Sequence, residues 1–184
     1  MTDRQRQSIM IKLNVNELKD KAPELKAGDE ILLSGIIYTA RDAAHKRIMA
    51  LLSDNSPLPF PIGGSVIYYA GPTPAKNFLP VGSCGPTTSS RMDVFAPTLY
   101  DKGMYATIGK GGRSVEVVNS IKRNNALYLC ALGGAGALAS KAITKCEVIA
   151  FEELGCESVK RMEIVDFPLY VGIDTNGNSI FHEV

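Results

Sequence analysis

The sequence lacks an excess of charge of either sign, a long apolar run, an internal repeat and a low-complexity linker. Twenty Lys and Arg residues balance 19 Asp and Glu residues, so no net field would draw the chain to nucleic acid or to an anionic membrane surface. No apolar run reaches the roughly 20 residues that a membrane-spanning helix needs, and the opening segment lacks the apolar core of an export signal. We therefore expect a cytoplasmic protein that binds neither nucleic acid nor membranes.

Cysteine is scarce, and its four occurrences follow no motif. Cys84, Cys130, Cys146 and Cys156 include no CxxC pair, so their spacing matches neither a zinc site nor the ligand run of an iron–sulfur cluster. Cys130 lies in the apolar segment ALYLCAL, where a buried free thiol is ordinary. We expect reduced thiols and no metal or cofactor ligated by this chain.

The sequence does contain enough apolar residues for a core, and a mixed pattern of strands and helices. With 45% hydrophobic residues in 184, we expect a single domain over 1–184, with 1–9 as a flexible N-terminus. Alternating or apolar runs predict strands within 10–15, 25–40, 65–71, 126–134, 145–153 and 165–181, the last a strand pair around the turn Asn176-Gly177. Helical spacing predicts helices over 39–54, capped by Thr39, over 91–100, broken at Pro97, over 114–125, capped by Ser114, and over 135–143. This alternation favours an α/β domain with a mixed sheet.

The segment VGSCGPTTSSRMD, residues 81–93, combines a Gly-Pro turn, four consecutive hydroxyl side chains, an arginine and an aspartate. It leads into a predicted helix, so 87–90 would lie at a helix N-terminus, where free N–H groups and the helix dipole attract an anion. The hydroxyls can donate to the same anion, and Arg91 adds a planar fork suited to a carboxylate or phosphate. The alternative is that Thr88 or Ser89 only caps the helix while Arg91 is solvated, and the local pattern does not decide between the two.

Two further segments carry basic residues where a ligand would approach. In TARDAAHKR, Arg41 and His45 lie four residues apart on one helix face, where His45 could orient Arg41 or donate to a ligand. The alternatives are a satisfied, half-buried histidine and a salt bridge of Arg41 with Asp42 or a neighbouring chain. In TIGKGGRS, glycines around Lys110 let the backbone approach a ligand, although the spacing is not that of a Walker loop and an ordinary turn is the alternative.

The motifs TARDAAHKR, GPTTSSRMD, IGKGG, ALGGAGAL and DFPLYVGID resemble, in order and approximate separation, those of one enzyme family. This family is the beta subunit of iron–sulfur-dependent class I fumarate hydratases and L-tartrate dehydratases. The resemblance covers nearly all of the chain, and the first two motifs are specific. It implies a swivelling β/β/α domain with a mixed sheet, like the mobile domain of aconitase-type enzymes. Such a domain closes over a [4Fe-4S] cluster ligated by a separate alpha subunit, in an α2β2 assembly.

The resemblance also implies which residues bind the substrate. Arg41 and Arg91 would clamp the carboxylates of a four-carbon dicarboxylate, and Lys110 would contact a carboxylate or a hydroxyl. Thr88 and Ser89, as hydroxyl donors of the same segment, complete the set of candidate substrate-binding residues.

The candidate catalytic residues are Thr87 and His45. Thr87 matches the threonine proposed as catalytic base in the family, and His45 would support it. A neutral hydroxyl is a poor base at neutral pH, so Thr87 needs a neighbour or a relay that lowers its pKa.

Two positions depart from the family pattern: Cys84 and Ser90 stand where relatives commonly have Ala and Gly. Neither change removes a charged group, but both leave open whether the substrate is the usual one.

We expect a fumarate hydratase subunit, with an L(+)-tartrate dehydratase subunit as the alternative. A phosphate- or nucleotide-binding module and an interaction protein that docks a partner through its arginines fit the motif order less well.

Overall fold

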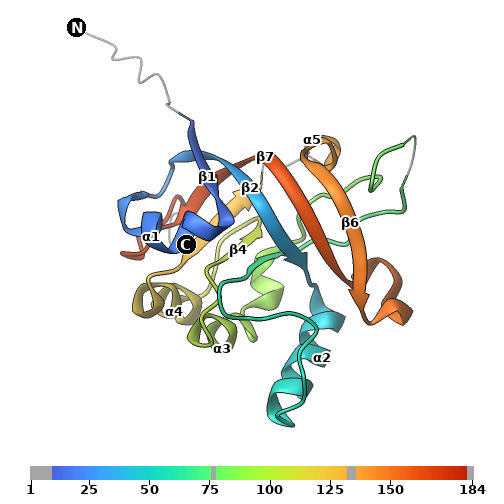
Figure 1. The fold of residues 1–184 in the computed structure, drawn as a ribbon. Coiled ribbons are helices and arrows are strands. Elements are labelled where there is room, and N and C mark those ends of the chain that lie inside the picture. The colour runs from blue at the N-terminus through green and yellow to red at the C-terminus, as the bar shows by residue number, and fades with distance from the viewer. Residues whose placement is uncertain (1–9, 76–77, 132–135, 182–184) are drawn as a thin grey trace, which may run out of the picture.

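The computed structural model describes residues 10–75, 78–131 and 136–181, which form one mixed sheet with helices packed against it (Figure 1). The strands are β1 (Ile11–Asn14), β2 (Glu30–Thr39), β3 (Val66–Tyr68), β4 (Ala106–Gly109), β5 (Leu127–Ala131), β6 (Ile143–Ala150) and β7 (Val159–Ile173). The α-helices are α1 (Leu18–Lys21), α2 (Asp42–Ser53), α3 (Ala96–Asp101), α4 (Val115–Asn124) and α5 (Gly136–Ala142). Short 3-10 helices are η1 (Val15–Glu17), η2 (Ala22–Glu24), η3 (Ser89–Met92) and η4 (Glu152–Glu157). The predicted flexible N-terminus, 1–9, and part of the ALGGAGAL motif, 132–135, lie outside the described residues.

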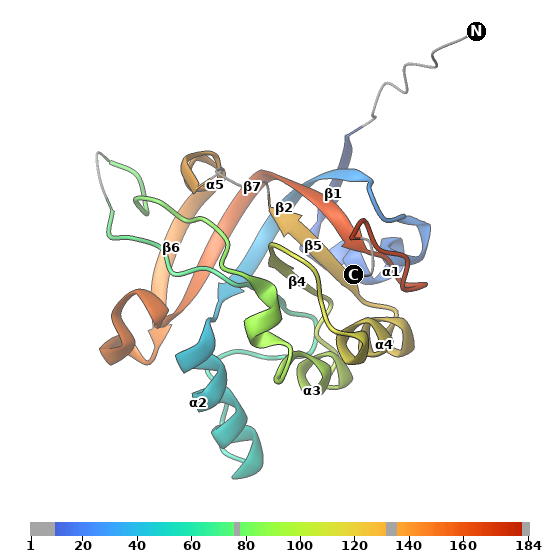
Figure 2. The ribbon, with the colours of Figure 1, turned by 180° about the vertical axis from the view of Figure 1, so that it is seen from behind.

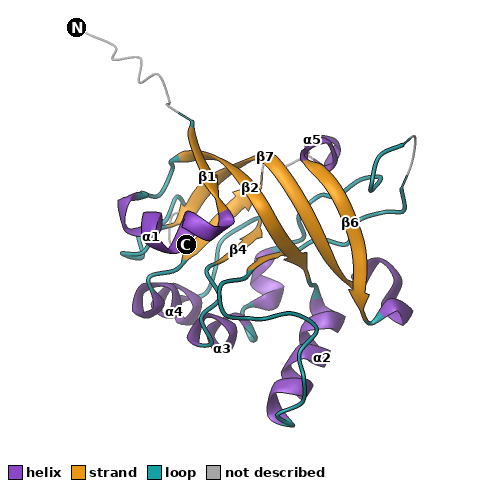
Figure 3. Ribbon diagram, viewed as in Figure 1, coloured by secondary structure: helices purple, strands orange, loops and turns teal. Residues whose placement is uncertain are grey.

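The long strand β7 closes the sheet on itself. Strands β1 to β5 pair in parallel in sequence order, whereas β7 runs antiparallel to β2 along one side and to β5 and β6 along the other. Strands β2, β3, β4, β5 and β7 therefore form a ring, and α2, α3 and α4 group on one side of it (Figure 3). The predicted α/β domain with a mixed sheet is confirmed.

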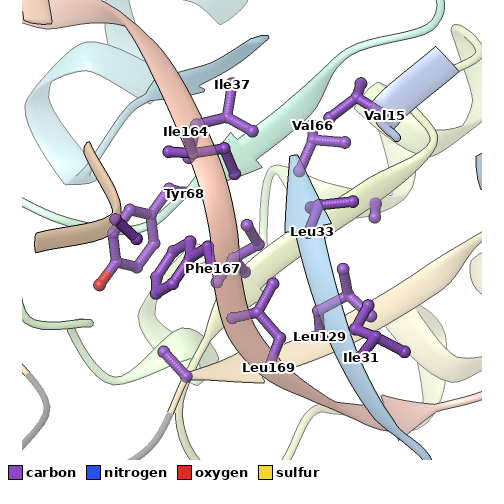
Figure 4. Packing of buried hydrophobic residues seen from close by; sticks show 14 of the residues in the cluster. Val15, Ile31, Leu33, Ile37, Val66, Tyr68, Leu129, Ile164, Phe167 and Leu169 are labelled. Atoms are coloured by element: carbon purple, nitrogen blue, oxygen red, sulfur yellow. The ribbon is translucent and has the colours of Figure 1, made fainter. Parts of the chain in front are cut away.

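The apolar residues form two buried clusters that hold these layers together. Inside the ring, Leu33 of β2 lies opposite Phe167 of β7, within a larger group of aliphatic side chains from facing strands (Figure 4). Outside the ring, Ile48 of α2, Leu99 of α3 and Ile121 of α4 pack together with the outer face of the strands. Burying each such side chain contributes roughly 1.5–3 kcal/mol, so the helices are fixed to the ring by their apolar faces.

The ends of the predicted helices are partly as expected. Ser114 caps α4 as predicted, because its side chain accepts a hydrogen bond from the N–H of Val117. The prediction that Thr39 caps a helix is wrong: Thr39 ends β2, where its hydroxyl accepts from the N–H of Lys160 at 3.1 Å. Pro97 does not break a helix but stands in the first turn of α3, where its missing N–H would have had no partner.

The C-terminal segment differs from the predicted strand pair. Strand β7 begins at Val159, six residues before the predicted start, because its first half pairs with both β2 and β6. The chain turns at Asn176-Gly177 as predicted, and Gly177 has the positive φ of 82° that favours glycine. Beyond the turn, the described residues pair with β7 through a single bridge between Ile173 and Ser179. No helix in the described ranges is long and apolar enough to span a membrane.

Candidate functional site

The site residues gather where three parallel strands end. Strands β2, β3 and β4 finish at the same edge of the sheet, and the chain continues from them into Arg41, Gly71 and Lys110. The segment 86–89 crosses this edge, with Pro86 bridged to Ala70 and Thr88 bridged to Lys110. Ligands of parallel α/β sheets, whether open or closed into a barrel, bind at the carboxyl ends of the strands, so the topology brings the predicted residues to a suitable place.

The crossing segment ties Thr87 to the end of β3 and Thr88 to Lys110. The N–H of Thr87 donates to the carbonyl of Tyr69 at 2.7 Å, and the N–H of Ser89 donates to the carbonyl of Lys110 at 2.9 Å. Thr87 is half-buried, while Thr88 and Lys110 are exposed. Within the described ranges, the two threonine hydroxyls and the Lys110 ammonium make no side-chain hydrogen bond or ion pair. These groups are therefore available to a ligand.

Ser89 faces inward and holds the crossing segment in place. Its hydroxyl is buried, accepts from the N–H of Lys110 at 3.0 Å and lies 2.9 Å from the hydroxyl of Tyr128. It also packs against Gly109, where an added Cβ would lie 1.8 Å from the Ser89 Oγ. Ser89, predicted to bind substrate, is thus placed to position Lys110 from behind rather than to reach a ligand itself.

Arg91 lies beside the start of α2, where it forms a two-point ion pair. Its Nε donates to Oδ1 of Asp42 at 3.1 Å, and its Nη2 lies 2.9 Å from Oδ2, an oxygen that makes no hydrogen bond within the described residues. Figure 2 shows the backbone behind this contact, with the green segment around residue 90 beside the start of α2. The alternative of a merely solvated arginine is therefore wrong. Thr88 stands at the N-cap of η3 without a side-chain capping bond, so the capping alternative fails for Thr88 as well.

Arg41 stands at the N-cap of α2, just after the end of β2. Its Nε lies 3.8 Å from Oε1 of Glu157 in η4, and neither of these two buried atoms has a hydrogen-bond partner among the described residues. Gly71 makes room for the side chain, since a Cβ there would lie 3.0 Å from Nη1 of Arg41. The predicted alternative partner, Asp42, pairs with Arg91 instead.

His45 lies behind Arg41 and is completely buried. Its Nδ1 is 2.8 Å from the carbonyl of Arg41, which can only accept, so Nδ1 carries the proton. The ring stacks on Phe95 and meets the edge of Tyr69. Burial lowers the pKa of His45 from its ordinary value of 6.5 to about 4, so the ring is neutral at pH 7. The geometry suits positioning of the α2 start rather than direct proton transfer.

Arg113 is the central residue that sequence reasoning missed. Its side chain is fully buried, and its Nε donates to Oδ1 of Asp93 at 2.6 Å. The guanidinium lies over the rings of Tyr69 and Tyr128, 5.4 and 4.8 Å from their centroids, and donates to Thr107 at 3.0 Å. Asp93 follows Arg91 by two residues, so this network anchors η3. The sequence offered no signal, because Arg113 lies 20 positions from its carboxylate.

A hollow of about 770 Å³ opens beside η3, between the start of α4 and the turn after β7. Its lining includes Ser90, Arg113 and Phe181. Two apolar side chains are exposed nearby, Val94 at 77% and Val115 at 63%. The hollow thus has both polar and apolar groups at its margin.

The cysteines do not fit an iron–sulfur cluster. All four are free, and burial raises the pKa of Cys84 to about 12 and that of Cys130 to about 11, so both are protonated thiols. Over the described part of the chain, no three His, Cys, Asp or Glu side chains gather as metal ligands. The site described above is therefore cationic and hydroxyl-bearing, and suits an anionic ligand.

Comparison with known proteins gives a consistent family. The family model described as Fumarase C-terminus matches residues 1–184. A "Putative L(+)-tartrate dehydratase subunit beta" from Methanocaldococcus jannaschii is 40% identical over 90% of this chain and 88% of its own length. "Fumarate hydratase 2" from Leishmania major is 34% identical over 93% of this chain and 30% of its own length. "Fumarate hydratase class I, anaerobic" from Escherichia coli is 32% identical over 97% of this chain and 33% of its own length.

These comparisons confirm the resemblance inferred from the motifs. The chain spans about a third of the length of the fumarate hydratases it matches, and most of the length of the tartrate dehydratase subunit.

Proposed function

Because the chain belongs to the family described as Fumarase C-terminus, we propose that it is the beta subunit of a hydro-lyase that hydrates or dehydrates a four-carbon dicarboxylate. The reaction proposed first is the reversible hydration of fumarate to L-malate. The observation that supports the proposal is that the segments carrying Arg41, Thr87 and Lys110 start from one edge of the sheet, with Thr88 bridged to Lys110 and Arg91 paired with Asp42, the residue after Arg41. L(+)-tartrate dehydration is the second candidate, since the tartrate dehydratase subunit matches this chain over most of its own length.

The two arginines suit the two carboxylates of such a substrate. A guanidinium grips a carboxylate through two parallel N–H bonds, and each charge-assisted bond contributes about 1.5–3 kcal/mol. Arg41 has a buried Nε without a hydrogen bond among the described residues, so a substrate carboxylate can satisfy it. The exposed Lys110 adds a point charge for a carboxylate or hydroxyl oxygen, and Thr88 adds a hydroxyl donor.

In the proposed reaction, Thr87 takes the proton from the carbon next to the departing hydroxyl. Removing this proton builds negative charge on the adjacent carboxylate, and fixed cations stabilise that charge most strongly where water is excluded. Thr87 must give up its own hydroxyl proton before it can accept this one, and Lys110, whose backbone is bridged to Thr88, adds a positive charge at the same strand end. His45 supports this chemistry by holding the start of α2 through the carbonyl of Arg41.

We place the [4Fe-4S] cluster on a partner alpha subunit, because the described cysteines of this chain do not fit as its ligands. When bound, the cluster would supply a Lewis acid for the departing hydroxyl. The hollow beside η3 and the exposed Val94 and Val115 support a partner surface next to the site. We propose an α2β2 assembly in which residues 1–184 act as one swivelling domain, like the mobile domain of aconitase. The four free cysteines suit a reducing, cytoplasmic compartment.

The test is to reconstitute this chain with its cluster-bearing partner and assay fumarate, L-malate and L(+)-tartrate. We expect turnover from the pair and none from this chain alone.

Thr87→Val keeps the shape of the side chain but removes the hydroxyl, and should lower the kcat of the pair by at least about a hundredfold, the lower end for a general base. Exchange of solvent deuterium into the substrate should fall in parallel, while a dicarboxylate inhibitor still binds.

Thr98→Val is the matched control, because Thr98 is also half-buried but belongs to α3. It should leave turnover and exchange unchanged. Exchange at the wild-type rate in Thr87→Val would mean that another group takes the proton, and a pair inactive on all three compounds would overturn the proposed function.

A further inference from the structure

The ion pair between Asp42 and Arg91 occupies only one edge of the guanidinium. Asp42 accepts from Nε at 3.1 Å and faces Nη2 at 2.9 Å. A guanidinium has five N–H donors in a rigid fork, and only Nε makes a hydrogen bond to Asp42, so the Nη1 and Nη2 donors remain for another acceptor. The pair therefore fixes the plane of Arg91 and leaves a second edge for a substrate carboxylate.

The two partners differ in how firmly they are held. Asp42 is the first residue of α2, whose start is fixed because His45 bonds the carbonyl of Arg41 and Ala40 bonds the carbonyl of Tyr68. Arg91 belongs to the four-residue η3, and its side chain is 51% exposed. A long exposed side chain samples many rotamers unless a fixed partner holds it. Asp42 is that fixed partner.

The position of Asp42 in the chain also links the two arginines. Asp42 directly follows Arg41 in the chain and forms the ion pair with Arg91. The start of α2 therefore carries Arg41 itself and also the carboxylate that holds Arg91. The spacing between the two guanidinium groups then depends on the start of α2 rather than on two independent side chains. A fixed spacing between two carboxylate-binding groups favours ligands whose carboxylates are separated by a matching distance.

We propose that Asp42 is a positioning residue that orients Arg91 and thereby selects four-carbon dicarboxylates over shorter and longer ones. The inference rests on the proposed function for its substrate class. Without Asp42, Arg91 must be ordered when the substrate binds. Immobilising one such side chain weakens binding by roughly two- to tenfold.

The test compares Asp42→Asn with Asp101→Asn in the reconstituted pair. Asp101 also forms an ion pair with an arginine, Arg123, here through two hydrogen bonds of 2.7 Å, but it belongs to α3. We expect Asp42→Asn to lower kcat/KM roughly two- to tenfold. We also expect the variant to discriminate less among inhibitors, so that its inhibition constants for malonate and glutarate come closer to its inhibition constant for succinate. Asp101→Asn should change neither. Asp42→Glu keeps the charge but moves the carboxylate by one methylene, and should narrow the preference as well.

Measurements at different salt concentrations separate two effects of Asp42→Asn: the loss of Arg91 orientation and the loss of the negative charge. Removing a carboxylate beside Arg91 also removes a repulsion against an anionic substrate, and that effect is screened by salt. The loss of inhibitor preference should persist at high salt. A preference that is unchanged in Asp42→Asn, or a change that disappears at high salt, would overturn the proposal.

A second measurement does not depend on activity. In the wild-type chain, the Arg91 Nε–H should give a distinct NMR signal protected from solvent exchange, and Asp42→Asn should lose it. The Arg123 signal should persist in that variant. Retention of the Arg91 signal would overturn the orienting role. A wild-type pair without turnover, combined with loss of the signal, would instead overturn the proposed function while supporting the orienting role.

Discussion

Arg91 must satisfy two carboxylates at once if the proposed function holds, Asp42 on one edge and the substrate on the other. A lysine at this position keeps the charge, but its compact ammonium cannot present two parallel donors to each partner. We expect Arg91→Lys to lower kcat/KM of the reconstituted pair by about tenfold to a hundredfold. This corresponds to the loss of one charge-assisted hydrogen bond, about 1.5–3 kcal/mol.

Arg123→Lys is the control for this change, because Arg123 is also ion-paired with a carboxylate, Asp101, on the surface between α3 and α4. It should leave the kinetic constants unchanged. Wild-type kcat/KM in Arg91→Lys would show that the planar fork of Arg91 is not needed, and the clamp would have to be assigned elsewhere.

His45 gives the protein a stability that depends on pH. Burial lowers the pKa of His45 to about 4 in the folded state, against about 6.5 in the unfolded chain. The unfolded chain therefore binds more protons between these two values. The free energy of unfolding is therefore unaffected by the titration of His45 above about pH 6.5, and it decreases as the pH drops toward 4, by about 3 kcal/mol in total.

The substitution His45→Asn should remove this part of the pH dependence. An asparagine can still donate to the carbonyl of Arg41, but it does not titrate. Urea unfolding of both proteins at several values between pH 4 and pH 7 would measure the slopes. We expect a shallower slope for the variant, and equal slopes would mean that His45 does not carry the dependence.

At the scale of the element, the crossing segment 86–89 depends on the absence of a side chain at Gly109. A Cβ there would lie 1.8 Å from Oγ of Ser89 and 3.2 Å from its Cβ, so the Ser89 hydroxyl would have to leave the position in which it accepts from the N–H of Lys110. Gly109→Ala should therefore displace Thr87 and Lys110 relative to each other. We expect it to lower the kcat of the reconstituted pair at least tenfold, since small misplacements of reacting groups are costly.

The matched change is Gly63→Ala, because a Cβ at Gly63 would meet only a backbone oxygen at an ordinary 3.6 Å. This variant should retain activity and thermal stability. Normal activity in Gly109→Ala would show that the crossing segment tolerates a shift and that its register does not set the site.

Local patterns predicted the elements whose determinants lie close in the sequence. The helix that begins after Ser114 is one example, because its cap and its apolar face lie within a few turns. Thr39 was misjudged because its hydroxyl bonds to the backbone of Lys160, 121 positions away. The first half of β7 was missed for the same reason, since its charged residues read as a strand only beside β2 and β6.

The site shows the same division. Arg41, Arg91, Lys110 and Thr87 were predicted from motifs, and the structure brings their segments to one edge of the sheet. The counter-ion Glu157 could not be predicted, because it reaches Arg41 only through the fold of η4. A motif identifies a functional group, whereas its partners are set by tertiary contacts.

At the scale of the whole molecule, closure of the ring by β7 separates a rigid part from the segments that carry the site. The apolar interior of the ring is shared by strands from both halves of the chain, such as Leu33 and Phe167. The strand ends are therefore fixed relative to one another. Arg41 and Lys110 directly follow the ends of β2 and β4, and Thr87 is tied to the end of β3 because its N–H donates to the carbonyl of Tyr69. A domain that closes on a partner needs such a frame, because its cations must arrive in a fixed arrangement.

The guanidinium of Arg113 between two tyrosine rings also has an optical consequence. The chain has seven tyrosines and no tryptophan, so tyrosine dominates its near-ultraviolet circular dichroism. Tyr69 and Tyr128 are fully buried and face the same fixed cation, which places both rings in an asymmetric environment. Near-ultraviolet signals vanish when side-chain packing is lost, even where secondary structure persists. The protein thus carries an intrinsic, label-free reporter beneath the residues that would meet its substrate.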